Sequence, residues 1–507
     1  MLTMLSQNYI SINYKRLLLG IGTVLLLLNC TQKQEVTPTI ESDVLNVKVT
    51  DPVYRDFDDI QRTGVLRMIT SYSSGSYFLY RGIQVGFEYE LVKEFARQNN
   101  LAVEVIIPTE DENPYDLLNS GAGDIIAASY TITDERKKIV DFTRPYNLVN
   151  QMIVVSDKLG LEPESITDLA GIPIAIRRNS SYYHTLMDLK EQGFDIQIEL
   201  VPQDMDTESL LFQVARGTYK ATVADDHIFS ASSNYMNGLI KGPQVSERDE
   251  IAWAIRKNSN DLEAQLNKFL YQHFKYDEDG VPKRSAFLNV LRKKYFKGSN
   301  QIADYFNPEY QTRNFGSISP YDSLMKSVGE EFGLDWVMLT AIAAQESKFD
   351  PYSESWAGAV GIMQVLPRFS EISLDSLYVP EYNIREGARI ISEHLDHYAY
   401  MDSTNRWQFA LATYNAGMGH LADARRLSID QNKNPNEWEN VSESLLKLMQ
   451  RRYYQHARYG FARGIETVRY VNEIMNRYNT YQAILALANT RNERTAGIFG
   501  IKTFNSP

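Results

Sequence analysis

The spacing of apolar residues changes once along this chain, and this change constrains the fold more than any other feature. Up to about residue 297, short strand-like apolar runs alternate with helical segments, as at 64–70, 101–107, 124–128, 172–176 and 221–224. Such alternation predicts an α/β architecture with mostly parallel sheets. From 319 to 478 the spacing is helical, which predicts an all-α domain. A chain of 507 residues, 43% of them hydrophobic, can form a core for each domain.

The boundary between the two patterns lies at 298–318, a stretch of Gly, Ser, Asn and Pro without sustained periodicity, which predicts a linker. Ser319, Pro320 and Asp322 then have the order expected at a helix start, and Gly333 is expected to end that helix. We therefore assign the first domain to 57–297 and the second to 319–480. Residues 481–507 receive no assignment.

Residues 1–29 have the pattern of a bacterial export signal. Lys15 and Arg16 precede an apolar run, Leu17 to Leu28, that is too short to span a bilayer. Cys30, the only cysteine, follows in an arrangement that resembles a lipobox, which implies acylation of that cysteine and a membrane anchor. The alternative is an uncleaved signal anchor with a chance cysteine. Lipidation leaves no thiol for a disulfide, and the polar stretch 30–56 predicts a flexible tether.

Charge and ligand spacing argue against several classes of partner. The formal net charge is −12, so the basic field that a nucleic-acid partner requires is missing. His394 and His397 share a helix face without a third ligand, and the acidic turn at 277–280 lacks the spacing of a calcium loop. We predict no metal and no cofactor.

Glu346 is the first candidate for catalysis. Asp335 can cap a helix that begins at Trp336, and on a helical repeat Ile342 and Ala343 share a face with Glu346. An apolar environment favours the neutral, proton-donating carboxyl, so we expect a pKa of roughly 6. The alternative is a helix-end glutamate that points into water. Asp350, the nearest second carboxylate, precedes a proline and reads as a helix-ending turn rather than a nucleophile.

The first domain resembles the family 3 extracellular solute-binding proteins, the two-lobed amino-acid binders of the periplasm. The resemblance covers about 240 residues and rests on these segments: 86–91 (GFEYEL), Gly123–Asp124, 131–136 (TITDER), 141–146 (DFTRPY), 169–171 (LAG), 179–181 (NSS) and Ala224–Asp225. It implies a periplasmic-binding-protein fold with a small ligand between the lobes.

The same resemblance implies a set of ligand contacts. Arg136 would grip a carboxylate through two parallel hydrogen bonds. Ser180 and Ser181 would add donors at a helix start, Asp225 would accept the ligand ammonium, and Phe78, or Tyr77, would form an aromatic wall. The alternatives are a surface salt bridge for Arg136 and a simple cap or turn residue for Asp225.

The second domain resembles the soluble-lytic-transglycosylase domain, whose fold is lysozyme-like. Five segments in the same order carry this resemblance over about 160 residues: 345–347 (QES), 355–367 (with GIMQ), 383–387 (NIREG), 412–417 (ATYNAG) and 466–471 (with YV). Residues 434–438, Tyr453–Tyr454 and 459–464 fit the variant found in membrane-bound lytic transglycosylases that carry both domains.

This resemblance implies roles around Glu346, which would be the single catalytic acid. Gln364 and Asn415 would bind sugar hydroxyl and acetamido groups, Met363 and Tyr414 would line the substrate surface, and Tyr470 would orient Glu346. The alternatives are ordinary: Met363 as core filler, Tyr470 as a buried helix tyrosine, and Asn415 as a cap.

Together these features predict a lipid-anchored periplasmic enzyme that cleaves peptidoglycan glycan strands without water, with a module that binds an amino acid or a muropeptide. Thr31, after Cys30, favours the outer membrane. Two alternatives stay open: a solute-binding lipoprotein with a non-catalytic wall-binding domain, and a muramidase that adds water.

Overall fold

The computed structural model describes residues 45–499 except 74, 110, 204 and 298–316. The predicted signal, Cys30 and almost the whole linker therefore lie outside the described residues. Within the described residues, no helix combines the length and the apolar composition needed to cross a bilayer.

The first domain consists of two lobes, each built on its own sheet. In lobe 1 the strand order is β4-β1-β5-β13-β6, and β7 also pairs with β13. β1 pairs in parallel with β4 and β5, whereas β13 is antiparallel to β5. The strands of this sheet are β1 (Val65–Ile69), β4 (Ala102–Ile106), β5 (Ile125–Thr131), β6 (Asp141–Phe142), β7 (Asn147–Val149) and β13 (Asp249–Ile255).

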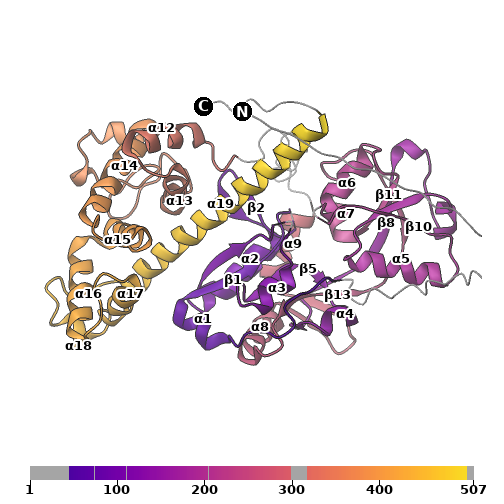
Figure 1. Cartoon of the computed structure of the whole chain (residues 1–507), viewed down its shortest axis with the longest axis horizontal. Coiled ribbons are helices and arrows are strands. Elements are labelled where there is room, and N and C mark those ends of the chain that lie inside the picture. Colours follow the sequence, from indigo (N-terminus) through magenta and orange to yellow (C-terminus); the bar gives the residue numbers. More distant parts are fainter. Residues whose placement is uncertain (1–44, 74, 110, 204, 298–316, 500–507) are drawn as a thin grey trace, which may run out of the picture. The chain divides into compact units, whose positions relative to one another are not determined.

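Six helices and two short hairpins complete lobe 1 (Figure 1). The helices are α1 (Phe57–Thr63), α2 (Phe87–Gln98), α3 (Pro114–Asn119), α4 (Asp134–Lys137), α8 (Asn260–His273) and α9 (Ala286–Phe296). The hairpins are β2 (Phe78–Tyr80) with β3 (Ile83–Val85), and β14 (Phe274–Tyr276) with β15 (Pro282–Arg284).

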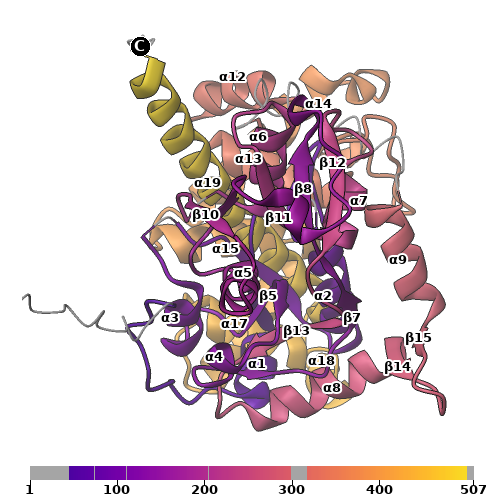
Figure 2. The same cartoon turned by 90° about the vertical axis from the view of Figure 1, so that its right-hand side faces the viewer.

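Lobe 2 has a five-stranded sheet in the order β10-β9-β11-β8-β12. Its two faces carry separate apolar clusters: α5 covers one face, and α6 with α7 the other (Figures 1 and 2). Its strands are β8 (Gln151–Ser156), β9 (Pro173–Ile176), β10 (Gln197–Leu200), β11 (Ala221–Asp225) and β12 (Leu239–Gln244), and its helices are η1 (Asp157–Leu159), η2 (Ile166–Leu169), α5 (Ser181–Glu191), α6 (Thr207–Ala215) and α7 (Asp226–Ser232). The chain crosses between the lobes after β7 and returns to lobe 1 at β13. The α/β two-lobed prediction is therefore confirmed. The expectation of mostly parallel sheets is wrong, because β13, β8 and their partners pair antiparallel and make both sheets mixed.

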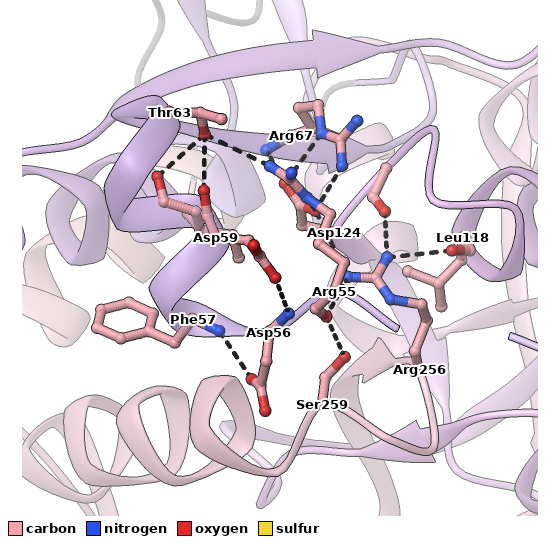
Figure 3. Close-up of polar contacts among 12 residues, drawn as sticks. Arg55, Asp56, Phe57, Asp59, Thr63, Arg67, Leu118, Asp124, Arg256 and Ser259 are labelled. Carbon is pink, nitrogen blue, oxygen red and sulfur yellow. Dashed lines mark hydrogen bonds and ion pairs between the residues drawn. The ribbon is translucent and has the colours of Figure 1, made fainter. Parts of the chain in front are cut away.

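A buried carboxylate ties the entry segment to lobe 1. Asp124 has no exposed side-chain surface and lies within ion-pair distance of Arg55, Arg67 and Arg256, at 2.8, 2.8 and 3.5 Å (Figure 3). Arg256 also donates to the Arg55 carbonyl at 3.0 Å. From Leu45 onward, backbone groups of the predicted tether bond to α3, as in Lys48 N–H to Asp116 at 2.7 Å. The last part of that segment thus lies against the domain.

In the described residues of the second domain the regular elements are all helices, joined by turns and by isolated β-bridges. The predicted helix at 322 is α12, and Gly333 ends it with a φ of 66°. The elements are α12 (Asp322–Phe332), α13 (Trp336–Glu346), η3 (Pro367–Phe369), η4 (Asp375–Tyr378), α14 (Pro380–His397), α15 (Ser403–Ala416), α16 (Met418–Asp430), α17 (Trp438–Lys447), α18 (Arg451–Tyr454) and α19 (Gly464–Phe499). The all-α prediction is confirmed.

The long helix α19 continues past the boundary predicted at residue 480 (Figure 1). Tyr481 is fully buried, and its hydroxyl donates to the Gly82 carbonyl in the β2–β3 turn at 2.5 Å. Thr480 donates to the Val105 carbonyl of β4 at 3.3 Å. The helix continues there because its buried face changes partner, from the helices of its own domain to lobe 1.

Candidate active site

Helix α13 places Glu346 at its C-terminal end. Asp335 caps the start of the helix by accepting a hydrogen bond from the Val337 N–H at 2.8 Å. All residues from Val337 to Ala344 are buried, so the helix is fixed in the core, while Glu346 itself is partly exposed. Lys348 and Phe349 have φ values of 56° and 66°, which end the helix and turn the chain away. A carboxyl at the edge of the core results.

A ladder of side-chain contacts holds α13 against α19. Tyr478 donates to Asp335 at 2.7 Å, and Arg477 donates to Gln345 at 2.9 Å. Gln345 donates to Glu473 at 2.7 Å. The last contact in the ladder is a short hydrogen bond from the Tyr470 hydroxyl to Oε1 of Glu346. The structure therefore brings Tyr470 and Glu346 together.

Burial raises the pKa of Glu346 to about 7, and the hydrogen bond from Tyr470 opposes part of that rise. The carboxyl loses hydration at this position, and loss of hydration penalises the charged form. The direction agrees with the expected shift, and the value is somewhat higher than the roughly 6 expected from the apolar helix face. Near neutral pH the group can both give and take a proton.

The segment between Glu346 and α14 is held by a buried asparagine. Asn383, at 1% exposure, donates to the carbonyls of Val360 and Leu377 at 2.9 and 2.8 Å and accepts from the Met363 N–H at 2.7 Å. Gly361 has a φ of 79°, and a Cβ there would lie 2.3 Å from the Asn383 amide. Glycine is required at this point by both conformation and space.

The predicted substrate residues occupy different environments. Gln364 donates to the carbonyls of Ser353 and Gly361, both at 3.0 Å, so its amide braces this segment. Asn415 is exposed and accepts from the Thr467 hydroxyl at 3.0 Å. The Tyr414 hydroxyl donates to the Met363 carbonyl at 2.7 Å. Met363 has no exposed surface, and it packs beneath Gly387 of α14. Its side chain lies in the core rather than at the surface.

The site contains one well-placed carboxyl. Asp350 is exposed and accepts from the Tyr352 N–H at 2.9 Å, which makes it a turn residue. The causes of the Glu346 pKa shift include no neighbouring carboxylate. Within the part of the chain that the structure describes, no cluster of three or more His, Cys, Asp or Glu side chains has the arrangement of a metal site.

In the first domain, the structure brings three of the predicted ligand contacts to one region between the lobes. Arg136 donates to the Thr131 carbonyl at 2.7 Å and stacks on Tyr130. Ser180 caps α5 by accepting from the Tyr183 N–H at 3.3 Å. The Ser181 hydroxyl lies 3.4 Å from that of Thr131, so the start of α5 in lobe 2 touches lobe 1.

Asp225 ends β11 and is 2% exposed. Burial raises its pKa to about 8, with further contributions from Asp249 and Asp226, while Tyr182 and Arg136 oppose the shift. Its Oδ1 has no hydrogen-bond partner among the described residues. A buried carboxyl with an unpaired oxygen suits a ligand cation, because a cation beside it would favour its charged form and lower its pKa.

Phe78 lies elsewhere, fully buried in the core of lobe 1, with its ring edge-on to Tyr295 at 6.3 Å between centroids. Sequence reasoning gave no role to Asn383, Thr131 or Tyr182. Asn383 stood in a quoted motif, but its three backbone bonds follow only from the packing. Thr131 contacts Ser181, and Tyr182 contacts Asp225. These partners lie far apart in the sequence, so no local pattern indicates the contacts.

A helical domain whose core helix ends in a partly exposed glutamate of raised pKa, joined to a two-lobed α/β domain, is the architecture of a modular lytic transglycosylase. Residues 323–437 match the Transglycosylase SLT domain, and 67–278 match the bacterial extracellular solute-binding proteins, family 3. Solved structures similar to the first domain include an ancestral arginine-binding protein, 26% identical, covering 46% of this chain and 98% of its own, with a TM-score of 0.38.

Full-length relatives identify the family. Membrane-bound lytic murein transglycosylase F of Desulfosudis oleivorans is 31% identical over 83% of this chain and 90% of its own length. The protein of the same name from Shewanella woodyi is 32% identical over 92% and 91%. The chain belongs to the membrane-bound lytic murein transglycosylase F family, and it is a lytic transglycosylase whose substrate is peptidoglycan.

Proposed function

We propose that this enzyme cleaves the β-1,4 bond between N-acetylmuramic acid and N-acetylglucosamine without water and leaves 1,6-anhydro-muramoyl ends. One observation carries the proposal: a single carboxyl, Glu346, with a pKa of about 7 and no carboxylate partner in the described site. Hydrolytic glycosidases generally divide acid and base or nucleophile roles between two carboxyls. A lone group must perform both proton transfers.

In the first step the protonated Glu346 gives its proton to the glycosidic oxygen, and the bond from that oxygen to C1 of the muramoyl unit breaks. The acetamido oxygen of the same sugar bonds to C1 and stabilises the positive charge. In the second step the Glu346 carboxylate takes the proton of the O6 hydroxyl, O6 attacks C1, and the acetamido bond to C1 breaks. Glu346 ends protonated, ready for another cycle.

The other site residues serve this reaction by position. Tyr470 orients the carboxyl and stabilises its charged form through their hydrogen bond. Tyr414 and the exposed Asn415 contact the sugar, Gln364 keeps the neighbouring segment in place, and Met363 supports it from the core.

Mass spectrometry of digested peptidoglycan tests the mechanism. We expect anhydro-muramoyl products from the native chain and none from Glu346→Gln, which removes the proton but keeps the shape. Products with reducing ends would refute the non-hydrolytic step. Unchanged activity in Glu346→Gln would refute the assigned acid.

We also propose that the first domain binds an amino acid or a muropeptide and influences catalysis. Arg136 holds the ligand carboxylate, Ser180 and Ser181 add donors, and Asp225 holds the ammonium. A route to the second domain supports the regulatory part. A Cβ on Gly82, in the β2–β3 turn, would lie 2.3 Å from the ring of Phe349, three residues after Glu346.

Calorimetric titration of the full chain with amino acids and stem peptides tests this binding, with Asp225→Asn as the control. We expect heat from the native chain and a large loss of affinity in the control. No heat with any of these ligands would refute the binding role, and equal activity with and without a bound ligand would refute regulation.

We further propose that Cys30 carries the lipid that attaches the enzyme to the outer membrane, on its periplasmic face. The support is the export pattern at 1–29, with Cys30 and Thr31 after it. Labelled fatty acid should enter the native chain and not Cys30→Ser, and membrane fractionation should recover the native chain with the outer membrane. Labelling of both chains would refute the assigned cysteine.

A further inference from the structure

One solvent-exposed tryptophan stands near the proposed catalytic residues without a role in them. Trp356 is 89% exposed, the most exposed of the large hydrophobic side chains in the described residues. Trp356 belongs to a turn whose backbone is held by hydrogen bonds. The Ser355 N–H donates to the Ala359 carbonyl at 2.9 Å, and the Gly361 N–H donates to the Ser353 carbonyl at 2.9 Å. The indole ring is therefore exposed to solvent, while the backbone that carries it is held in place.

The turn that carries Trp356 belongs to the same segment as the proposed site. Ser353 accepts from the Gln364 amide, and Ser347, next to Glu346, donates to the Ile362 carbonyl at 2.8 Å. Both ends of the turn are thus attached to residues around the catalytic carboxyl.

Arg463 lies beside Trp356. Its guanidinium lies 5.6 Å from the centroid of the indole ring and 3.6 Å from the carboxylate of Glu466, and its side chain is 64% exposed, so a ligand carboxylate would share it with Glu466. Its carbonyl accepts from the Thr467 N–H at 3.2 Å, so Arg463 is fixed at the start of α19. Thr467 contacts Asn415 and Tyr470 contacts Glu346, which places Arg463 about 10 Å along the helix from Tyr470. That reach is longer than one sugar ring.

The sequence stretch that ends at Arg463 is basic, although Lys447 pairs with Glu443 at 2.6 Å and Arg463 with Glu466. Between Glu443 and Glu466 the sequence contains Lys447, Arg451, Arg452, Arg458 and Arg463 and no acidic residue, although the net charge of the chain is −12. Helix α17, which ends at Lys447, packs against α19. Stem peptides of peptidoglycan carry carboxylates, so this basic segment complements them.

We propose that Trp356 and Arg463 form a distal binding site for the same glycan strand, beyond the sugars that react. The indole stacks on a sugar ring, and the guanidinium pairs with a carboxylate of an attached stem peptide. This site selects strands that still carry peptides. The inference rests on peptidoglycan being the substrate, and it concerns binding rather than the chemical step.

Kinetics on two substrates test the site: peptidoglycan strands with their stem peptides, and strands freed of peptides by an amidase. Trp356→Ala is expected to raise KM about fivefold on both substrates, with kcat nearly unchanged, because ring stacking contributes about 1 kcal/mol. Arg463→Ala is expected to raise KM about threefold on the peptide-bearing strands only, as for an exposed ion pair. Trp356→Phe should recover most of the lost affinity, and added salt should remove the Arg463 effect.

Two controls keep the outcomes separate. Tyr400→Ala removes a 60% exposed aromatic residue between α14 and α15, far along α15 from Asn415, and it should leave KM unchanged. Sedimentation with intact sacculi in a Glu346→Gln background measures binding without turnover. If the native chain releases no anhydro products, the proposed reaction fails, and sedimentation still tests this surface. Unchanged KM and unchanged sedimentation in both Trp356→Ala and Arg463→Ala would overturn the proposal.

Discussion

Replacing Tyr470 with phenylalanine tests the electrostatic account of the site most directly. The Tyr470 hydroxyl donates to Glu346 and so stabilises its charged form, while burial acts in the opposite direction and raises the pKa to about 7. A hydrogen bond to a charged group contributes about 1.5–3 kcal/mol. One pKa unit corresponds to 1.36 kcal/mol. Loss of this bond should therefore raise the pKa of Glu346 by about 1 to 2 units.

The assay is the release of anhydro-muropeptides as a function of pH, analysed as kcat/KM, which reports groups of the free enzyme. Because the reaction begins with protonated Glu346, kcat/KM of the native enzyme should fall as the pH rises through about 7. In Tyr470→Phe the same fall should appear at a pH about 1 to 2 units higher, with a lower plateau because the carboxyl is less well oriented. Tyr478→Phe is the matched control, since that hydroxyl bonds Asp335 on the same two helices. In Tyr478→Phe, kcat/KM should fall near pH 7, as in the native enzyme.

A native profile with no fall near pH 7 would contradict the burial of Glu346. If kcat/KM of Tyr470→Phe falls at the same pH as in the native enzyme, or at a lower pH, the hydrogen bond from Tyr470 does not lower the pKa of Glu346. An equal shift in Tyr478→Phe would mean that the packing of α13 against α19, rather than the bond to the carboxyl, sets the pKa.

Three further predictions concern stability and the contact between domains. The pKa of Glu346 in the folded protein, about 7, lies above the ordinary glutamate value of 4.5. The native chain therefore loses up to about 3 kcal/mol of stability as the pH rises from 4.5 through 7. Glu346→Gln should melt higher than the native chain at pH 8 and equally at pH 4, and equal melting at pH 8 would contradict this. Asn383→Ala should lower the free energy of chemical unfolding by about 3 kcal/mol and abolish activity, because three buried hydrogen bonds are lost. Unfolding like that of the native chain would exclude this bracing role. Gly82→Ala places a Cβ 2.3 Å from the ring of Phe349 at a φ of +84°, so both the melting temperature and kcat should fall. An unchanged kcat would mean that this turn does not influence the active site.

Much of the fold follows from local sequence. The five strand-like runs correspond to β1, β4, β5, β9 and β11 within a few residues, since apolar stretches between helical segments have few other options. Gly333 ends α12 in a left-handed conformation. Glycine adopts this conformation readily, so the residue type alone predicts the end of the helix. The raised pKa of Glu346 was also predictable, because the apolar face of its helix lies within the same short segment.

Other features depend on contacts that no local pattern contains. Met363 follows Ile362 in the GIMQ segment, and nothing in the sequence distinguishes a methionine at the surface from one beneath Gly387. The predicted end of the second domain, residue 480, falls inside α19. The helix continues, since Thr480 and Tyr481 bond to lobe 1, from which they are separated by hundreds of residues. Phe78 looked like a wall of the ligand site and packs instead against Tyr295, which lies far along the chain.

A buried carboxyl with a raised pKa does not by itself identify the catalytic acid, and Glu88 shows why. Glu88 is fully buried on α2, and burial raises its pKa as it does that of Glu346. Both of its oxygens are engaged, however: Oε1 by Ser129 and Tyr146, and Oε2 by the Trp253 N–H at 2.9 Å. Such a group holds a core together and cannot reach a substrate.

Glu346 differs from Glu88 in the two respects that a reaction requires. It is partly exposed, and among the described residues only Oε1 receives a hydrogen bond, from Tyr470. Oε2 can therefore meet a glycosidic oxygen while Oε1 stays fixed, and the tyrosine holds the same geometry when the carboxyl returns as a base. The combination of partial exposure, one fixed oxygen and a pKa near neutrality, rather than burial alone, is what supports a single residue acting in both steps.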